Sequence, residues 1–187
     1  ARELAALATT AVAPDVLARA RAIVARQQAG ASPELSASIV ICTRDRPDEL
    51  ARCLASLALQ TMRAVEVVVV DNASRDGRTR EVALRAGVVY VREDRPGLDF
   101  ARNAGARAAT GRIVAYTDDD VRLHPRWLER MVAAFNAQDV MAVTGLVLPA
   151  RLDTEAQIHF EAHWSFGRSY RPIDFDQRFF DADRVYG

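Results

Sequence analysis

Short apolar runs alternate with amphipathic stretches through the middle of the chain. Four runs have the length and composition of buried strands, at 38–43, 65–70, 88–91 and 113–116. Four consecutive valines occupy 67–70, which is typical of a strand covered on both faces. Because helical segments separate these runs, the pattern predicts an α/β fold with a mostly parallel sheet, right-handed crossovers and flanking helices.

Proline and glycine residues indicate where the predicted helices begin and end. Pro47 suits the first turn of a helix because its φ is already helical. Gly87 and Gly111 each follow a helical stretch, and we expect both to close it, Gly111 as a left-handed C-cap. A further strand is expected at 140–148. The remaining helices are expected over 76–86, over 98–110 and from 124 to about 137.

The two ends of the chain differ from this middle part. Residues 1–36 predict an N-terminal helical extension and linker, with Gly30 and Pro33 in the linker. Beyond Pro149 the apolar pattern predicts no regular element. Because the first residue is not methionine, we expect the chain to be part of a longer protein.

Composition narrows the classes of function. Half of the 187 residues are apolar and the formal net charge is zero, so net charge does not favour binding to nucleic acid or to a membrane surface. The apolar runs are too short for a transmembrane helix or a signal peptide. Cys42 and Cys53 lack metal-ligand spacing, and we expect small buried side chains in a reducing compartment. The expected location is cytoplasmic, free or peripheral to the inner face of the membrane.

Two absences exclude further classes. The chain contains no lysine, so a P-loop lysine, a Schiff-base lysine and a lysine general base are excluded. It also contains no G-x-G-x-x-G segment, the usual fingerprint of dinucleotide binding.

Three adjacent aspartates, Asp118, Asp119 and Asp120, follow the run at 113–116. Their mutual repulsion requires a cation or a capped loop to compensate. Alternation along extended backbone places Asp118 and Asp120 on one side and Asp119 on the other. Two carboxylates on one side suit Mg2+ or Mn2+, especially with phosphates as further ligands. The alternative is a solvated acidic loop.

Polar groups follow all four predicted strands of this middle part. In a parallel sheet these ends share one edge, where ligands bind. A carboxylate such as Asp71 can accept a hydrogen bond from a uracil or guanine ring, while Asp118 can hold a ribose hydroxyl. Arg44 and Arg102 can supply positive charge for a diphosphate or hydrogen bonds to the base, although Arg102 also suits a solvated helix. The polar ends lie at 43–45, 71–72, 92–95 and 118–120.

These segments together resemble the inverting glycosyltransferases of family 2, which have the GT-A fold, a Rossmann-like sheet. The resemblance covers residues 38 to about 150, and the motifs occur in the family's order and spacing. A later stretch, Ala-Val-Thr-Gly-Leu-Val-Leu-Pro at 142–149, also resembles bacterial members. The four motifs are Ser-Ile-Val-Ile-Cys-Thr-Arg-Asp-Arg-Pro (38–47), Val-Val-Val-Val-Asp-Asn-Ala-Ser (67–74), Gly-Leu-Asp-Phe-Ala-Arg-Asn-Ala-Gly (97–105) and Ala-Tyr-Thr-Asp-Asp-Asp (115–120).

The resemblance implies roles for particular residues. Thr43, Asp45 and Asp71 would line the nucleotide pocket, with Asp71 facing the base. Asp118 and Asp120 would be the outer residues of the D-x-D motif, on ribose and on a Mn2+ or Mg2+ ion. The implied reaction transfers a sugar with inversion from a nucleotide-diphosphate donor, by default a UDP-sugar, to a hydroxyl acceptor. That acceptor, whether glycan, lipid or small molecule, is not identified by the sequence.

One part of the family's pattern is missing. Its catalytic base normally belongs to a Glu-Asp pair downstream of the D-x-D motif, and no such pair follows residue 150. We therefore assign no base and expect 37–187 to be the donor-binding part of a longer enzyme, without the acceptor and base part. The aromatic and arginine-rich stretch 155–187 is expected to be an acceptor-side loop region or a surface covering.

Two alternatives stay open. A non-catalytic sugar-nucleotide-binding module would also lack the base. A nucleotidyltransferase uses a similar sheet with paired carboxylates on magnesium, but usually needs a glycine-rich loop after the first strand. Residues 43–47 contain no glycine, which disfavours this second alternative.

Overall fold

The computed structural model describes residues 35–136 and 140–165 of the chain. The chain divides between Val143 and Thr144 into two compact units. The helical extension predicted for 1–36 lies outside the described residues, apart from its last two positions. Within the described ranges, no helix is long and apolar enough to cross a membrane.

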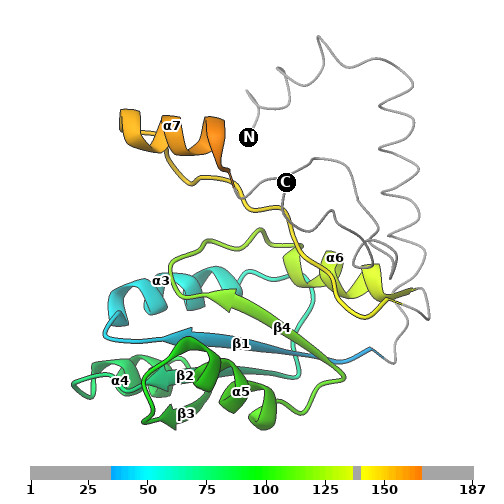
Figure 1. Ribbon diagram of the computed structural model, residues 1–187. Helices are drawn as coiled ribbons and strands as arrows, with labels where there is room; N and C mark the ends of the chain where they lie inside the picture. Colours follow the sequence, from blue (N-terminus) through cyan, green and yellow to red (C-terminus); the bar gives the residue numbers. More distant parts are fainter. Residues whose placement is uncertain (1–34, 137–139, 166–187) are drawn as a thin grey trace, which may run out of the picture. The chain divides into compact units, whose positions relative to one another are not determined.

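The first unit is built on a four-stranded sheet (Figure 1). Its strands are β1 (Ala37–Thr43), β2 (Glu66–Asn72), β3 (Val89–Glu93) and β4 (Ile113–Asp118). They lie in the order β3-β2-β1-β4, and every neighbouring pair is parallel. The four strands predicted between residues 38 and 116 and their parallel arrangement are therefore confirmed.

Helices cover both faces of this sheet, as the continuous apolar runs of the central strands require. On one face, Val40 of β1 and Val68 and Val70 of β2 pack with Ala101 of α5 (Leu98–Ala108). On the other face, the core includes side chains from α3 (Pro47–Leu57), α4 (Arg78–Arg85) and α6 (Trp127–Ala133). A helix begins at Pro47 as expected, and the helices expected over 76–86 and over 98–110 are present with shorter bounds. The helix expected from 124 to about 137 is α6, which is shorter at both ends and is followed by a 3-10 turn, η1 (Ala134–Asn136).

The two glycines expected to close helices behave differently. Gly87 follows α4 with φ +67, the left-handed conformation that glycine adopts without strain. The C-cap prediction for Gly111 is wrong, because α5 ends at Ala108 and Ala109 continues in extended conformation. Gly111 instead allows close approach of two chain segments: a Cβ there would lie 2.5 Å from the backbone nitrogen of Ser38.

The strand predicted at 140–148 is absent from the described structure. Met141 is 92% exposed, and Leu146, Val147 and Leu148 are each about half exposed. The prediction rested on β-branched and apolar composition, which reflects fit to a half-buried sheet surface rather than a backbone preference. Without a neighbouring strand to pair with, the same residues remain irregular.

The second unit contains a helix that the sequence pattern did not predict. α7 (Glu155–His163) begins with a capping box, in which the Thr154 side chain accepts from the Gln157 backbone and the Gln157 side chain accepts from that of Thr154. None of its residues is buried, so no apolar stripe marks it. The Thr-x-x-Gln spacing was the available signal. The remainder of the stretch 155–187, from 166 onward, lies outside the described residues.

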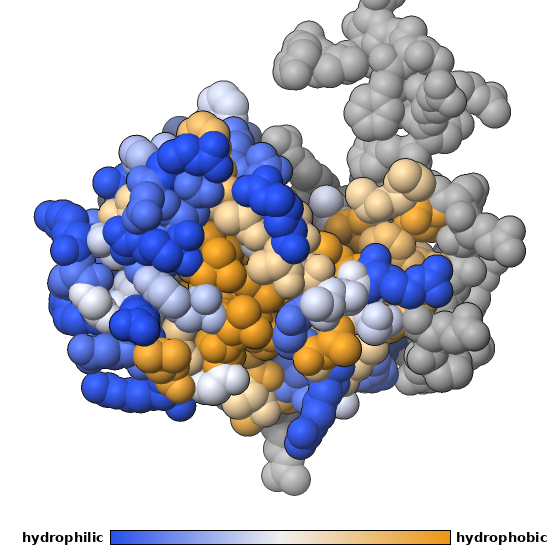
Figure 2. Space-filling view, turned by 90° about the horizontal axis from the view of Figure 1, so that it is seen from below, coloured by the Kyte–Doolittle hydropathy of each residue, from blue (hydrophilic) through white to orange (hydrophobic). Residues whose placement is uncertain are grey.

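One side of the sheet ends in an exposed strand. Among the residues that the structure describes, β3 pairs only with β2, and its Val89 is 42% exposed. The face of the molecule on the β3 side shows apolar side chains in the middle, surrounded by hydrophilic ones (Figure 2). Solvent-exposed apolar groups of this kind are common on folded surfaces and do not by themselves define a site.

Candidate functional site

The register of the sheet brings the polar strand ends to one edge. Thr43 of β1 lies opposite Asp71 of β2, and Asp71 lies opposite Arg92 of β3. On the other side of β1, Cys42 lies opposite Asp118 of β4. The prediction that four polar ends meet at the carboxyl edge is confirmed.

Asp119 points inward beneath this edge. It is 4% exposed, and its carboxylate accepts from the Thr43 hydroxyl at 2.6 Å and from Arg46 Nη1 at 3.0 Å. Burial raises the pKa of Asp119, while the bonds from Thr43 and Arg46 oppose that rise. The side-chain alternation separated Asp119 from its neighbours but did not identify these partners. A buried carboxylate requires such partners, since burying an unpaired charge is costly.

Asp118 and Asp120 are both exposed, whereas Asp119 is buried; β4 ends at Asp118, and the next two aspartates form a turn. Asp120 accepts from Arg46 Nη2 at 2.9 Å, so one guanidinium contacts two members of the triplet. In the described ranges, no three His, Cys, Asp or Glu side chains form a metal-binding group. Mg2+ usually takes one or two protein carboxylates and completes its shell with water and substrate phosphates. Two outward carboxylates fit that donor set, and Asp118 and Asp120 are the residues that would hold the ion.

Asp45 connects the loops after β1 and β2. Its backbone is left-handed with φ +53, and its N–H donates to the Ser74 hydroxyl at 2.9 Å. Its carboxylate accepts from the Arg75 backbone at 2.8 Å and from Arg75 Nε at 3.0 Å. The backbone bond from Arg75 is the main reason that the pKa of Asp45 is lowered. Asp45 therefore lies at the candidate edge with its carboxylate engaged in fixing two loops.

Asp71 is fully buried at the end of β2. Its carboxylate accepts from the Ser74 backbone at 3.0 Å, from the Tyr90 hydroxyl at 2.8 Å and from Arg92 Nη1 at 3.0 Å. Burial is the first cause of the raised pKa of Tyr90, and its bond to Asp71 is the second. A ring N–H of a nucleobase would have to share this carboxylate with three donors. Sequence reasoning identified Asp71 and placed Arg92 in a polar strand end at the same edge, but it did not predict Tyr90 or the pairing of Arg92 with Asp71.

Arg44 and Arg102 lie near the same edge with exposed side chains. The backbone carbonyl of Arg102 accepts from the Tyr116 hydroxyl at 3.0 Å, which joins α5 to β4. The positive charge of Arg102 acts to lower the pKa of the Cys42 thiol, but burial dominates and raises it to about 11. Burial likewise raises the pKa of Cys53 to about 12. Both thiols are therefore protonated near neutral pH and are not activated nucleophiles.

Asn72 organises the loop between β3 and α5. Its side-chain amide donates to the carbonyl of Arg95 at 2.7 Å and to that of Glu93 at 3.3 Å. Its side-chain oxygen accepts from the Gly97 N–H at 2.8 Å. The sequence placed Asn72 in the polar strand end 71–72 without a role of its own. Its three bonds instead hold the start of α5, and with it Arg102, beside the edge.

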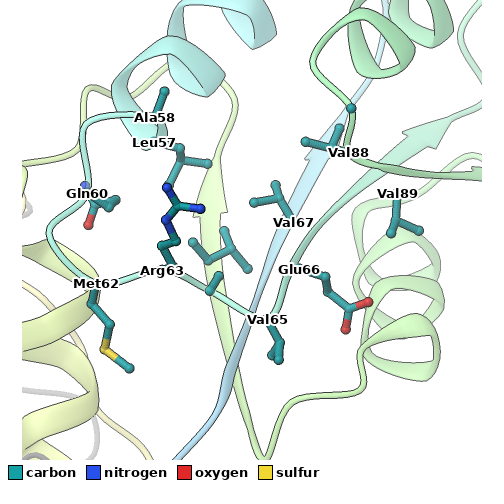
Figure 3. Close-up of a pocket in the computed structure, with 13 residues that line it drawn as sticks. Leu57, Ala58, Gln60, Met62, Arg63, Val65, Glu66, Val67, Val88 and Val89 are labelled. Carbon is teal, nitrogen blue, oxygen red and sulfur yellow. The ribbon is translucent and has the colours of Figure 1, made fainter.

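A hollow of about 570 Å³ lies at the opposite, amino edge of the sheet (Figure 3). Residues at the starts of β2 and β3 and at the end of α3 line it, and its polar groups come from Gln60, Arg63 and Glu66. The carboxylates and guanidinium groups described above all belong to the carboxyl edge. The hollow is therefore separate from the candidate site.

The fold and the site define an α/β domain of the kind that binds ligands at the carboxyl ends of parallel strands. The sequence matches glycosyl transferase family 2 over residues 38–183. The chain belongs to this family, and its sheet with flanking helices is the GT-A glycosyltransferase fold.

Several known proteins are similar to parts of this chain. Glycosyltransferase AglE of Haloferax volcanii is 33% identical over 118 residues, covering 59% of this chain and 38% of that protein. The succinoglycan biosynthesis protein ExoO of Rhizobium meliloti is 30% identical over 177 residues, covering 79% and 49%. The mannosyltransferase PcManGT of Pyrobaculum calidifontis, solved with GDP-Man and Mn2+, superposes with a TM-score of 0.52 at 28% identity, covering 58% and 34%. The chain thus spans about half or less of the length of these relatives.

Proposed function

We propose that this chain carries the donor-binding part of a metal-dependent glycosyltransferase. The substrate is a nucleotide-diphosphate sugar, and the reaction moves the sugar with inversion to an acceptor hydroxyl. The proposal rests on the carboxyl edge of the sheet, where the exposed carboxylates of Asp118 and Asp120 lie close to arginine side chains. The match of the chain to glycosyl transferase family 2 gives this arrangement its meaning. The similar mannosyltransferase solved with GDP-Man and Mn2+ supports the pairing of a sugar nucleotide with a divalent cation.

Different residues at the carboxyl edge bind different parts of the metal–nucleotide complex. Asp120 and Asp118 hold Mn2+ or Mg2+, and Asp118 also contacts the ribose. When bound, the ion supplies Lewis-acid stabilisation of charge on the departing diphosphate. Arg44 and Arg102 are exposed cations suited to phosphate oxygens. Thr43, Asp45 and Asp71 shape the pocket for the nucleoside through the hydrogen bonds that fix the loops.

The chemistry is a direct displacement at the anomeric carbon. The acceptor oxygen forms the new bond as the bond to the diphosphate breaks, and the acceptor proton passes to a general base. No residue is assigned as that base. UDP is the first nucleotide to test because of the family resemblance, and GDP is the second because of the mannosyltransferase. The two cysteines are both free, which suits a reducing cytoplasmic compartment.

Isothermal titration calorimetry of UDP in the presence of Mn2+ tests the proposal. Replacing Asp120 with alanine removes a charged ligand, and we expect UDP affinity to fall at least about tenfold, as loss of a charge-assisted contact implies. Glu81→Ala is the matched control, because Glu81 is also an exposed carboxylate in an arginine pair but lies on α4. Equal affinity in wild type and Asp120→Ala, for UDP and for GDP, would overturn the proposal.

A second measurement separates an enzyme from a binding module. Slow release of UDP or GDP from the corresponding sugar nucleotides, dependent on Mn2+ and lost in Asp120→Ala, indicates a transferase that also hydrolyses its donor. Tight binding without any turnover, in a chain extended to the full length of its relatives, would favour the non-catalytic module.

A further inference from the structure

Arg46 forms ion pairs with two members of the acidic triplet, Asp119 and Asp120. Its Nη1 lies 3.0 Å from Asp119 Oδ1, and its Nη2 lies 2.9 Å from Asp120 Oδ2. The two carboxylates differ in environment, since the Asp119 side chain is 5% exposed and that of Asp120 is 48% exposed. One guanidinium therefore joins a buried, structural carboxylate to an outward one.

The backbone on both sides fixes the position of Arg46. The preceding residue, Asp45, is left-handed and is tied to Ser74 through its N–H. The following residue, Pro47, begins α3, and the Arg46 carbonyl accepts from the Leu50 N–H at 3.1 Å. Because Asp119 is in turn held by the Thr43 hydroxyl, the inner half of the bridge has fixed partners.

We propose that Arg46 is an internal counter-cation that competes with the divalent metal for Asp120. This inference rests on the proposed function, in which Asp120 holds the ion. Without donor, Arg46 neutralises Asp120, so the free metal binds weakly. When metal and nucleoside diphosphate arrive together, the metal takes Asp120, and the released Nη2 of Arg46 can donate to a phosphate oxygen. Arg46 thereby makes metal and nucleotide bind cooperatively.

The geometry explains why this exchange is feasible. The Asp120 contact joins two half-exposed side chains, and such ion pairs are weak and readily replaced. The Asp119 contact stays, because that carboxylate is buried and has the Thr43 bond as well. Arg46 therefore remains at the edge after giving up Asp120. A guanidinium is well suited to this second role, since its planar donors match phosphate oxygens.

Calorimetric titration of Mn2+, with and without saturating UDP, tests the competition on the full chain. In Arg46→Met, Mn2+ alone should bind roughly two- to fivefold more tightly than in wild type, the range expected for an exposed ion pair. The gain in Mn2+ affinity on adding UDP should shrink in this variant. Arg46→Gln is also uncharged but retains hydrogen-bonding groups, and it should show the same change in Mn2+ affinity. This second variant keeps the test available if Arg46→Met folds poorly.

Arg52→Met is the matched control, because Arg52 is an exposed arginine of α3, the helix that directly follows Arg46, and is paired with Glu49. It removes the same charge without touching the triplet, and its Mn2+ binding should match wild type. Unchanged Mn2+ affinity in both Arg46 variants, or an equal rise in Arg52→Met, would refute the role of Arg46. If wild type binds UDP no better with Mn2+ than without, the proposed function fails and the competition fails with it.

Discussion

Gly105 offers a direct test of how α5 is seated on the sheet. This glycine faces the strands, and a Cβ built on it would lie 2.3 Å from Cγ1 of Val40 and 3.1 Å from Cγ2 of Val70. Both valines are fully buried. In Gly105→Ala, the added methyl group therefore meets side chains that have no free space to move into.

The size of the effect follows from two opposing terms. Valine is stiff at χ1, so the strain passes to the helix, which must move by about 1 Å to restore ordinary contact. Overpacking of this kind costs about 1–3 kcal/mol. Replacing glycine by alanine inside a helix returns up to about 1 kcal/mol. We expect a net loss of about 1–2 kcal/mol in the free energy of unfolding.

Urea unfolding followed by far-UV circular dichroism measures this loss. With a slope of about 2 kcal/mol per molar urea, the middle of the usual range, the midpoint should fall by about 0.5–1 M. Gly77→Ala is the control, because a Cβ at Gly77 would meet nothing within 4 Å and its φ is −82. That variant should unfold at or slightly above the wild-type midpoint.

A midpoint for Gly105→Ala equal to that of the control would refute the reasoning. It would mean that α5 does not pack on Val40 as described. The placement of Arg102 would then lose its basis, because α5 carries that side chain to the edge.

Two further predictions concern bonds at opposite edges of the sheet. In Thr43→Val, the buried Asp119 carboxylate loses its hydroxyl donor, so the free energy of unfolding should fall by about 1–3 kcal/mol in urea titrations. Thr61→Val, which removes an exposed hydroxyl bonded to Glu129, should cost less, and an equal loss would contradict a buried role for the Thr43 bond. At the amino edge, hydrogen bonds from Ser38 and then Thr110 lower the pKa of Glu66 from its usual 4.5. Because the folded pKa lies below the unfolded one, this stabilisation is complete above the unfolded value and is lost as pH falls below it. The Tm difference between wild type and Glu66→Gln should therefore be present at neutral pH and shrink as pH falls below the usual value of 4.5, whereas a difference independent of pH would contradict the linkage.

Much of the sheet could be predicted from local sequence alone. The valine run of β2 and the apolar run of β1 have a composition that only a doubly covered strand accommodates. Since parallel strands bring their carboxyl ends together, the meeting of Thr43, Asp71 and Asp118 at one edge followed from the order of the elements.

Three of the errors share a physical cause, because they concern contacts between segments that are distant in sequence. Whether 140–148 forms a strand depends on a pairing partner, which local composition cannot supply. Gly111 was predicted to be a helix cap. A glycine is needed there instead because the backbone of Ser38, distant in sequence, leaves no space for a Cβ. The partners of Asp119 were missed for the same reason, since Thr43 and Arg46 belong to the loop after another strand.

The topology of the sheet also has a consequence for the order of folding. Thr43 and Asp119 bond across 76 residues, whereas Ser38 and Glu66 bond across only 28. Closing the longer loop costs about 0.9 kcal/mol more chain entropy if both loops close from an open chain. Pairings of large sequence separation also form slowly. We therefore expect β4 to join β1 after β2 has done so, and the acidic triplet to take its place in the last kinetic phase of refolding.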